Sequence, residues 1–166
     1  MTLLSRLSRH CRMENGMVVL LDEPITHEAI GSMYAVHNKL GYGFLEHPYL
    51  GALEYECRRR GLTVEREVRI EIQYEGIVVG AYRVDLFLNR RVIVEVKTCA
   101  PHQDHEYQLL NYLRCSQAEV GLLMYFRRSA TFKRLVFRNE LKQRHASVDI
   151  RTSPGLTAPG SDPQLR

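Results

Sequence analysis

Two acids and a lysine on two adjacent apolar segments form the group of residues in this sequence that could best carry out chemistry. Asp85 lies within the apolar run 84–88, and Glu95 and Lys97 lie within the run 92–97. Side chains of a β-strand alternate between its faces, so Glu95 and Lys97 point to the same side. Carboxylate oxygens suit Mg²⁺ or Mn²⁺, and an amine nearby can stabilise negative charge as it develops. The three residues therefore predict a centre that could hold a divalent cation.

The loop between the two strands decides whether the acids meet. A three-residue loop at 89–91 places Leu88 opposite Val92, and the same register places Asp85 opposite Glu95, with Cβ atoms about 5 Å apart. A two-residue loop would place the acids on opposite faces. Two facing carboxylates repel each other, and a divalent cation between them converts that repulsion into coordination. The alternative that stays open is that each acid pairs with a nearby basic residue at the rim of the sheet.

Hydrophobic periodicity predicts the elements that position these residues. A helix is expected to begin near Thr26, as its N-cap, and a second helix to begin near Pro48 and end at Gly61. A strand bent at Gly80 is expected to carry Asp85. The expected elements are helices over about 26–40, 48–60 and 103–114, and strands around 68–72, 77–88, 92–98, 120–126 and 132–137. The pattern predicts an α/β domain.

Composition sets the limits of the chain. Its 166 residues, 45% apolar and 25% charged, fit one soluble domain. We predict a flexible N-terminal extension at 1–22, a folded domain at 23–141, and a disordered tail at 142–166, which is rich in Pro, Gly, Ser and Asp. The basic, acid-free residues 1–13 are typical of a transit peptide. The alternative is a frayed extension, or a true start at Met13 or Met17.

The expected cellular setting follows from two features. No apolar run approaches the roughly 18 residues that span a bilayer. The four cysteines form no C-x-x-C pair, which favours free thiols in a reducing compartment. We therefore expect a cytoplasmic protein with no membrane partner and no small-molecule cofactor.

Basic residues suggest an anionic partner. The net charge is +4, which mildly favours nucleic acid. Arg127, Arg128, Lys133 and Arg134 could follow a phosphate backbone. The alternative is a solvated strand edge, which lysine and arginine protect from aggregation.

Several ordered blocks of the sequence resemble one known family. Gly80-Ala-Tyr-Arg-Val-Asp85 followed by Val92-Ile-Val-Glu95-Val-Lys97 resembles the core of the PD-(D/E)XK nuclease superfamily. Residues 36–46 and 105–113 add two blocks similar to the bacterial GxxExxR group. Within the second block, a Q-x-x-x-Y signature resembles the RecB-like branch. The resemblance covers about residues 25–139. It implies a restriction-endonuclease-like core, with a central mixed β-sheet flanked by helices.

The resemblance also implies a set of metal ligands. Asp85, Glu95 and the backbone carbonyl of Val96 would bind Mg²⁺ or Mn²⁺. Glu46 would add an acid from the first helical region. The plain alternative for Glu46 is an acid that stabilises a helix start, and Glu54 is a competing acid in the same region.

Further roles are implied for residues around the acids. Lys97 would activate the attacking water or steady the charge on the phosphate, and Gln108 and Tyr112, one helical turn apart, would position the lysine or the substrate. Two positions depart from the family pattern: Val84 precedes Asp85 in place of proline, and Tyr49 stands where the group has arginine.

The sequence as a whole predicts a metal-dependent nuclease that hydrolyses nucleic-acid phosphodiester bonds, with DNA favoured. A second hypothesis keeps the fold and discards the reaction, leaving a module that binds nucleic acid or another partner. A third is a structural protein whose acidic pocket is incidental. Binding of Mn²⁺ at the paired acids would separate the first hypothesis from the third.

Overall fold

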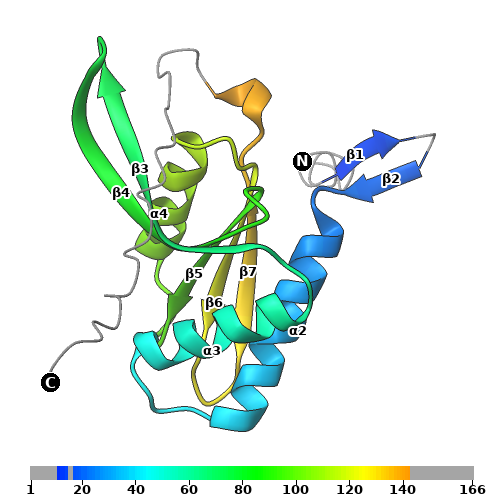
Figure 1. Ribbon diagram of the computed structural model, residues 1–166. Helices are drawn as coiled ribbons and strands as arrows, with labels where there is room; N and C mark the ends of the chain where they lie inside the picture. The colour runs from blue at the N-terminus through cyan, green and yellow to red at the C-terminus, as the bar shows by residue number, and fades with distance from the viewer. Residues whose placement is uncertain (1–10, 15–16, 143–166) are drawn as a thin grey trace, which may run out of the picture.

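The structure, a computed structural model, describes residues 11–14 and 17–142. Its main feature is a five-stranded mixed β-sheet with helices on both faces (Figure 1). The elements are, in chain order, β1 Cys11–Glu14, β2 Met17–Leu20, α2 Glu23–Leu40, α3 Glu46–Arg59, β3 Val64–Tyr74, β4 Ile77–Leu88, β5 Val92–Lys97, α4 Gln103–Arg114, β6 Val120–Tyr125, β7 Thr131–Val136 and the 3₁₀ turn η1 Asn139–Leu141. The predicted α/β class, with a central mixed sheet of the restriction-endonuclease-like kind, is confirmed.

The sheet has the order β3-β4-β5-β6-β7, and only β5 and β6 run parallel to each other. These two central strands are covered on both faces. Every residue of β6 is buried, and so is every residue of β5 except Lys97. Their nearly continuous apolar sequences follow from this double cover, because neither face meets water.

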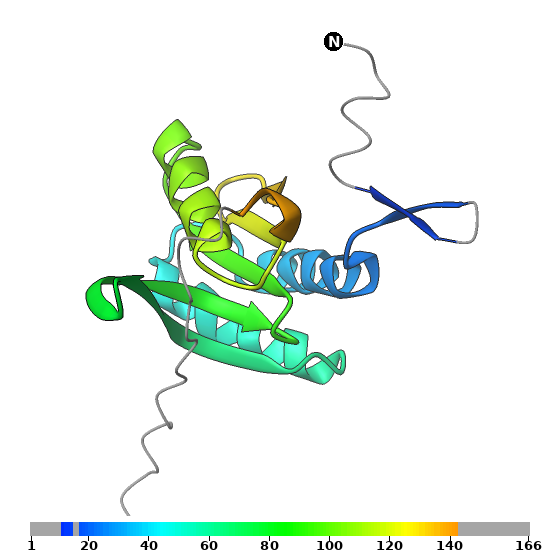
Figure 2. The same ribbon diagram turned by 90° about the horizontal axis from the view of Figure 1, so that it is seen from above.

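Two hydrophobic cores lie on opposite faces of the sheet. Helices α2 and α3 pack on one face and α4 packs on the other, as Figure 2 shows. The first core contains Met33 of α2 and Leu53 of α3, and the second contains Leu109 and Leu113 of α4. Because β5 and β6 contribute to both cores, the two strands are held from both sides.

The loop between β4 and β5 has the predicted length. Leu88 pairs with Val92 across residues 89–91, and the ladder continues to Leu86 and Val94. Asn89 and Arg90 adopt positive φ angles of 48° and 53°. The Asn89 side chain also accepts a hydrogen bond from the backbone N–H of Thr63, at 2.7 Å. The register on which the meeting of the two acids depends is therefore confirmed.

Helix α2 begins earlier than the sequence pattern predicted. It starts at Glu23, with Asp22 as its N-cap and Pro24 in the first turn, where the missing N–H of proline has no cost. Thr26 is buried inside the helix, and its hydroxyl donates to the carbonyl of Glu23 at 3.0 Å. The prediction that Thr26 is the N-cap was therefore wrong. The carboxylate of Asp22 instead pairs with Arg91 at 2.5 Å.

Part of the predicted N-terminal extension and the first residue of the predicted tail are described. Strands β1 and β2 form an antiparallel hairpin that precedes α2 and stands apart from the sheet in both views (Figures 1 and 2). Residues 1–10 and 15–16 of the predicted extension, and residues 143–166 of the predicted tail, lie outside the described residues. Lys142, the first residue of the predicted tail, donates to the carbonyls of Ser116 and Ala118, both at 2.7 Å.

Within the described part of the chain, no helix is long and apolar enough to cross a membrane. The cysteines whose side chains are described, Cys57, Cys99 and Cys115, are free thiols.

Close packing of α4 on β6 depends on Gly121. A Cβ added there would lie 2.7–2.8 Å from three carbon atoms of the buried Leu109 side chain. We expect Gly121→Ala to displace α4 and lower the free energy of unfolding by about 1–3 kcal/mol, measured by urea denaturation. Gly51→Ala is the control, because Gly51 lies within α3 with nothing within 4 Å of the added Cβ. Equal stability of the Gly121→Ala variant and the wild type would contradict the expectation.

Candidate active site

Asp85 and Glu95 meet where β4 and β5 separate. The strand ladder ends at Leu86 and Val94, and side-chain contacts replace it beyond that point. The backbone N–H of Asp85 donates to Oε1 of Glu95 at 3.2 Å. The N–H of Val96 donates to Oδ2 of Asp85 at 2.8 Å. Each carboxylate thus accepts a hydrogen bond from the backbone of the opposite strand, and the two acids lie together.

A backbone irregularity in β3 accompanies this separation. Glu67 has a φ angle of 52°. It lies between the two β3–β4 residue pairs on either side of Asp85. A left-handed residue interrupts the alternation of side chains along a strand. Val64 accordingly packs in the core of α2 and α3, whereas Val68 packs in the core of α4. The β3–β4 ribbon therefore changes faces at the level of Asp85, where β4 leaves β5.

Burial makes both carboxylates unusual. The Glu95 side chain is 2% exposed. Burial, followed by the charge of Asp85, raises the pKa of Glu95 to about 7. Burial also raises the pKa of Asp85, opposed by the hydrogen bond from Val96 and the charge of Lys97. A divalent cation would favour the ionised form of both acids. Two carboxylates that lie together fit a hard cation such as Mg²⁺ or Mn²⁺, because such ions prefer oxygen ligands.

Lys97 brings positive charge to the acids. Its Nζ lies 3.4 Å from Oε2 of Glu95, and its side chain is 15% exposed. The residue ends β5 next to Tyr125 of β6, at the edge where both parallel strands finish. The ammonium group is therefore held beside Glu95 and is partly exposed to solvent.

Helix α4 supplies two more of the predicted residues. Nε2 of Gln108 donates to the Tyr112 hydroxyl at 2.5 Å. Burial, and then the charge of Glu95, raises the pKa of Tyr112 to about 12, with a smaller effect from Asp85. The phenol therefore keeps its proton at neutral pH. Its ring also lies 5.2 Å from the ring of Tyr82 on β4.

The two candidate acids of α3, Glu46 and Glu54, differ in their surroundings. Glu46 is the first residue of the helix, and its charge contributes to the raised pKa of Asp85. Within residues 11–14 and 17–142, however, no three His, Cys, Asp or Glu side chains gather into a metal-binding group. Glu46 is thus near the acid pair without joining it. Glu54 pairs with Arg58 at 3.0 Å and Arg66 at 3.6 Å, which gives it a structural role.

The four candidate basic residues do not share one surface. Arg127 and Arg128 are exposed in the turn after β6. Lys133 of β7 pairs with Glu106 of α4 at 2.6 Å. The next residue, Arg134, points to the other face and donates to the carbonyl of Leu21. Because neighbouring side chains of a strand point to opposite faces, Lys133 and Arg134 lie on different faces of β7. Of the four basic residues, only the adjacent Arg127 and Arg128 are exposed side by side.

Tyr49, which stands where the resembled group has arginine, has a structural role that the sequence analysis missed. Its hydroxyl donates to the carbonyl of Gly41 at 2.9 Å, and the N–H of Phe44 donates to that hydroxyl at 3.4 Å. The ring is fully buried and stacks on Phe126, with centroids 4.4 Å apart. Its position on the apolar face of α3 with Leu53 was the signal that could have revealed this burial.

Arg66 of β3 was also missed. Its positive charge lowers the pKa of Asp85, in opposition to burial. Its guanidinium lies 3.0 Å from Nδ1 of His47 at the start of α3. Nothing in a strand with alternating charges marks one arginine as the one that reaches the site.

Comparison with known proteins agrees with this arrangement. A family model described as the PD-(D/E)XK nuclease superfamily matches residues 23–136, well over half of the chain. The chain therefore belongs to this superfamily. No curated protein matches the chain. A solved structure titled "Crystal structure of SSO0001" is similar, with 25% identity, a TM-score of 0.44 and coverage of 67% of this chain. The chain spans 56% of the length of that protein.

The raised pKa of Glu95 predicts a pH-dependent cost in metal-free protein. The folded-state pKa of Glu95 lies above the ordinary 4.5. The contribution of protonated Glu95 to the free energy of unfolding is therefore complete below pH 4.5 and is lost as pH rises through about 7. We expect Glu95→Gln to be more stable than wild type in EDTA at pH 8, by up to about 3 kcal/mol, and the gain to vanish near pH 4.5. Urea denaturation across this range measures the difference. A difference that does not change with pH would contradict the assignment.

Proposed function

We propose that the protein is a metal-dependent nuclease that hydrolyses phosphodiester bonds of nucleic acid, with DNA the favoured substrate. The observation that carries the proposal is the acid pair of buried Glu95 and half-buried Asp85, each bonded to the other's strand, with Lys97 at 3.4 Å from Glu95. A pair of like charges held largely away from water is costly in a fold that gains nothing from it. Membership of the nuclease superfamily supports the same conclusion.

The acids have the first role in this proposal. Asp85, Glu95 and the carbonyl of Val96 would hold Mg²⁺ or Mn²⁺. When bound, the cation would supply positive charge for the scissile phosphate and would acidify a water molecule. The N–H groups of Asp85 and Val96 keep one oxygen of each carboxylate fixed. Glu46 adds negative charge nearby, outside the acid pair.

The remaining residues would act on the substrate. Lys97 stabilises negative charge on the phosphate, and its ammonium group is held in place by Glu95. Gln108 and the protonated Tyr112 hydroxyl form a hydrogen-bonded pair that positions the lysine or the phosphate. This pair supports placing the chain with the GxxExxR group in the RecB-like branch. The free cysteines support a reducing, cytoplasmic setting.

A second candidate is a module that binds nucleic acid or another partner without cutting. The observation in its favour is that no third acid joins Asp85 and Glu95 among the described residues. Two carboxylates and one carbonyl are a small ligand set for an ion that takes six or more oxygens, so water or substrate must complete it.

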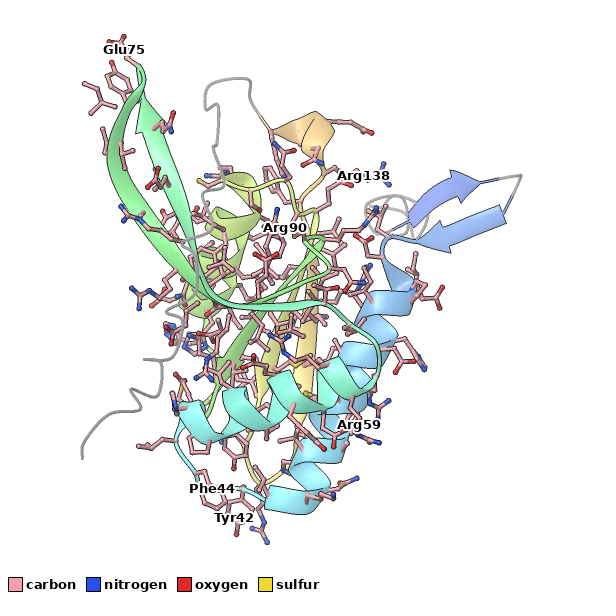
Figure 3. All side chains as sticks on the ribbon, in the orientation of Figure 1. Tyr42, Phe44, Arg59, Glu75, Arg90 and Arg138 are labelled. Atoms are coloured by element: carbon pink, nitrogen blue, oxygen red, sulfur yellow. The ribbon has the colours of Figure 1, made fainter. Side chains whose placement is uncertain are left out.

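Metal binding can be measured without activity. Millimolar Mn²⁺ should raise the melting temperature of the wild type by several degrees, because the folded state alone presents the two acids together. Asp85→Asn should abolish this rise. Glu75→Gln is the matched control: Glu75 lies at the tip of the β3–β4 hairpin, remote from the site (Figure 3), and the variant should keep the full rise. An undiminished rise in Asp85→Asn would place the metal elsewhere.

Cleavage tests the proposed function directly. Wild type should cut labelled DNA with Mg²⁺ or Mn²⁺, and Lys97→Ala should be slower by about 100-fold or more, because charge on the phosphate is no longer stabilised. Lys97→Met, which keeps the length of the side chain, should be equally impaired. An intact rise of melting temperature with Mn²⁺ would show that both variants are folded. If wild type cuts no single-stranded, duplex or branched DNA and no RNA with either metal, the binding module replaces the nuclease.

A further inference from the structure

The loop between α2 and α3 exposes aromatic side chains. Tyr42 is 63% exposed and Phe44 is 49% exposed. Both lie at the lower end of the molecule in Figure 3, where the loop passes beneath the sheet. Leu45, the next residue, is exposed as well. Two neighbouring aromatic rings in water are unfavourable unless a partner covers them.

This loop is fixed to the core of the protein. Gly41 and Gly43, on either side of Tyr42, have φ angles of 70° and 106°, which favour glycine. The buried Tyr49 hydroxyl then bonds to the carbonyl of Gly41 and to the N–H of Phe44. The exposed rings are therefore presented by an anchored backbone.

The same anchor connects the loop to positive charge. Tyr49 stacks on Phe126, which directly precedes Arg127 and Arg128. Nε2 of His37, in the last turn of α2, also lies 2.7 Å from the carbonyl of Arg127. Both arginines are exposed, and neither forms an ion pair within the described residues. Aromatic rings and uncompensated guanidinium groups thus belong to one end of the protein.

This end adjoins the candidate active site. Glu46 follows Phe44 by two residues, and its charge acts on both Asp85 and His105. Arg127 follows Tyr125 of β6 by two residues, and Tyr125 is the neighbour of Lys97 in the sheet. A strand bound at the acids would therefore pass close to both the aromatic loop and the two arginines.

We propose that Tyr42 and Phe44 form a stacking platform for unpaired bases and that Arg127 and Arg128 contact the adjoining phosphates. Exposed rings accept the face of any base, whereas the bases of a duplex are already stacked on each other. Arginine contacts alone would serve duplex and single strand alike. The proposal rests on the proposed function and names its substrate class: single-stranded nucleic acid, or a duplex with an unpaired end.

Binding can be measured without cleavage in EDTA at low ionic strength. The probes are a fluorescein-labelled single-stranded DNA, the RNA of the same sequence and the matching blunt duplex, followed by fluorescence anisotropy. We expect Tyr42→Ala and Phe44→Ala each to weaken binding of the single strand about 10-fold and to change duplex binding little. Tyr42→Phe and Phe44→Tyr should bind as wild type does, because the ring remains.

The control is Tyr74→Ala, because Tyr74 is 66% exposed at the β3–β4 hairpin, away from the site. It should bind the single strand as wild type does. Phe44 also contacts the Tyr49 ring edge-on, with centroids 6.0 Å apart. A DNA containing 2-aminopurine therefore gives a second readout, since stacking on Tyr42 should quench its fluorescence in wild type and in Tyr42→Phe but not in Tyr42→Ala. The DNA and RNA probes show which strand the platform takes.

The outcomes separate this proposal from the proposed function. Three outcomes would overturn the platform: wild type binds no single strand, the alanine substitutions weaken duplex and single-strand binding equally, or the alanine variants bind normally. The exposed rings would then be assigned to contact with a protein partner. Cleavage by wild type in that case would leave the nuclease standing. Loss of single-strand binding in the alanine variants, with no cleavage by wild type, would uphold the platform and refute the nuclease.

Discussion

The rest of the site depends on two like charges held between neighbouring strands, the buried Glu95 and the half-buried Asp85. Asp85 and Glu95 would repel each other strongly if both were ionised away from water. The backbone lowers this cost, because each carboxylate accepts an N–H from the opposite strand. Strands β4 and β5 separate where those bonds form. At the same level, the left-handed backbone of Glu67 lets the β3–β4 ribbon pack on the opposite face of the sheet. The two carboxylates are therefore held in a fixed arrangement, as the proposed metal site requires.

The two cores hold this opening in shape from both sides. Val94 and Val96 of β5 pack with α2 and α3, whereas Ile93 packs with α4. A strand that is clamped on both faces cannot rotate to move Glu95 and Lys97 into water. Close contact at Gly121 brings α4 against the sheet, which places Tyr112 within the electrostatic influence of both acids. Packing thus sets the relative positions of groups that would otherwise separate.

Local sequence predicted the strand register, but it misplaced one helix start and did not predict contacts between residues far apart in the chain. The length of the 89–91 loop fixed the register of β4 and β5, because strand pairing has a period of two. The start of α2 was misplaced at Thr26, since the periodic pattern outweighed the signal of Pro24. The burial of Tyr49 against Phe126 and the contact of Arg134 with Leu21 join residues far apart in the chain. The helical face of Tyr49 could have revealed its burial, but no local pattern identifies the distant partner in such a contact.

The ion pairing of the arginines is a better indicator of nucleic-acid binding than the net charge of the chain. Arg58, Arg90 and Arg91 each bond to an acid within the domain, so their charge is compensated locally. Arg127 and Arg128 have no such partner among the described residues. Part of the uncompensated charge of the described residues therefore lies beside the end of β5, where Lys97 is held. A phosphate backbone attracted to these two arginines would be brought toward the acid pair, so a modest net charge is enough if it is placed at the site.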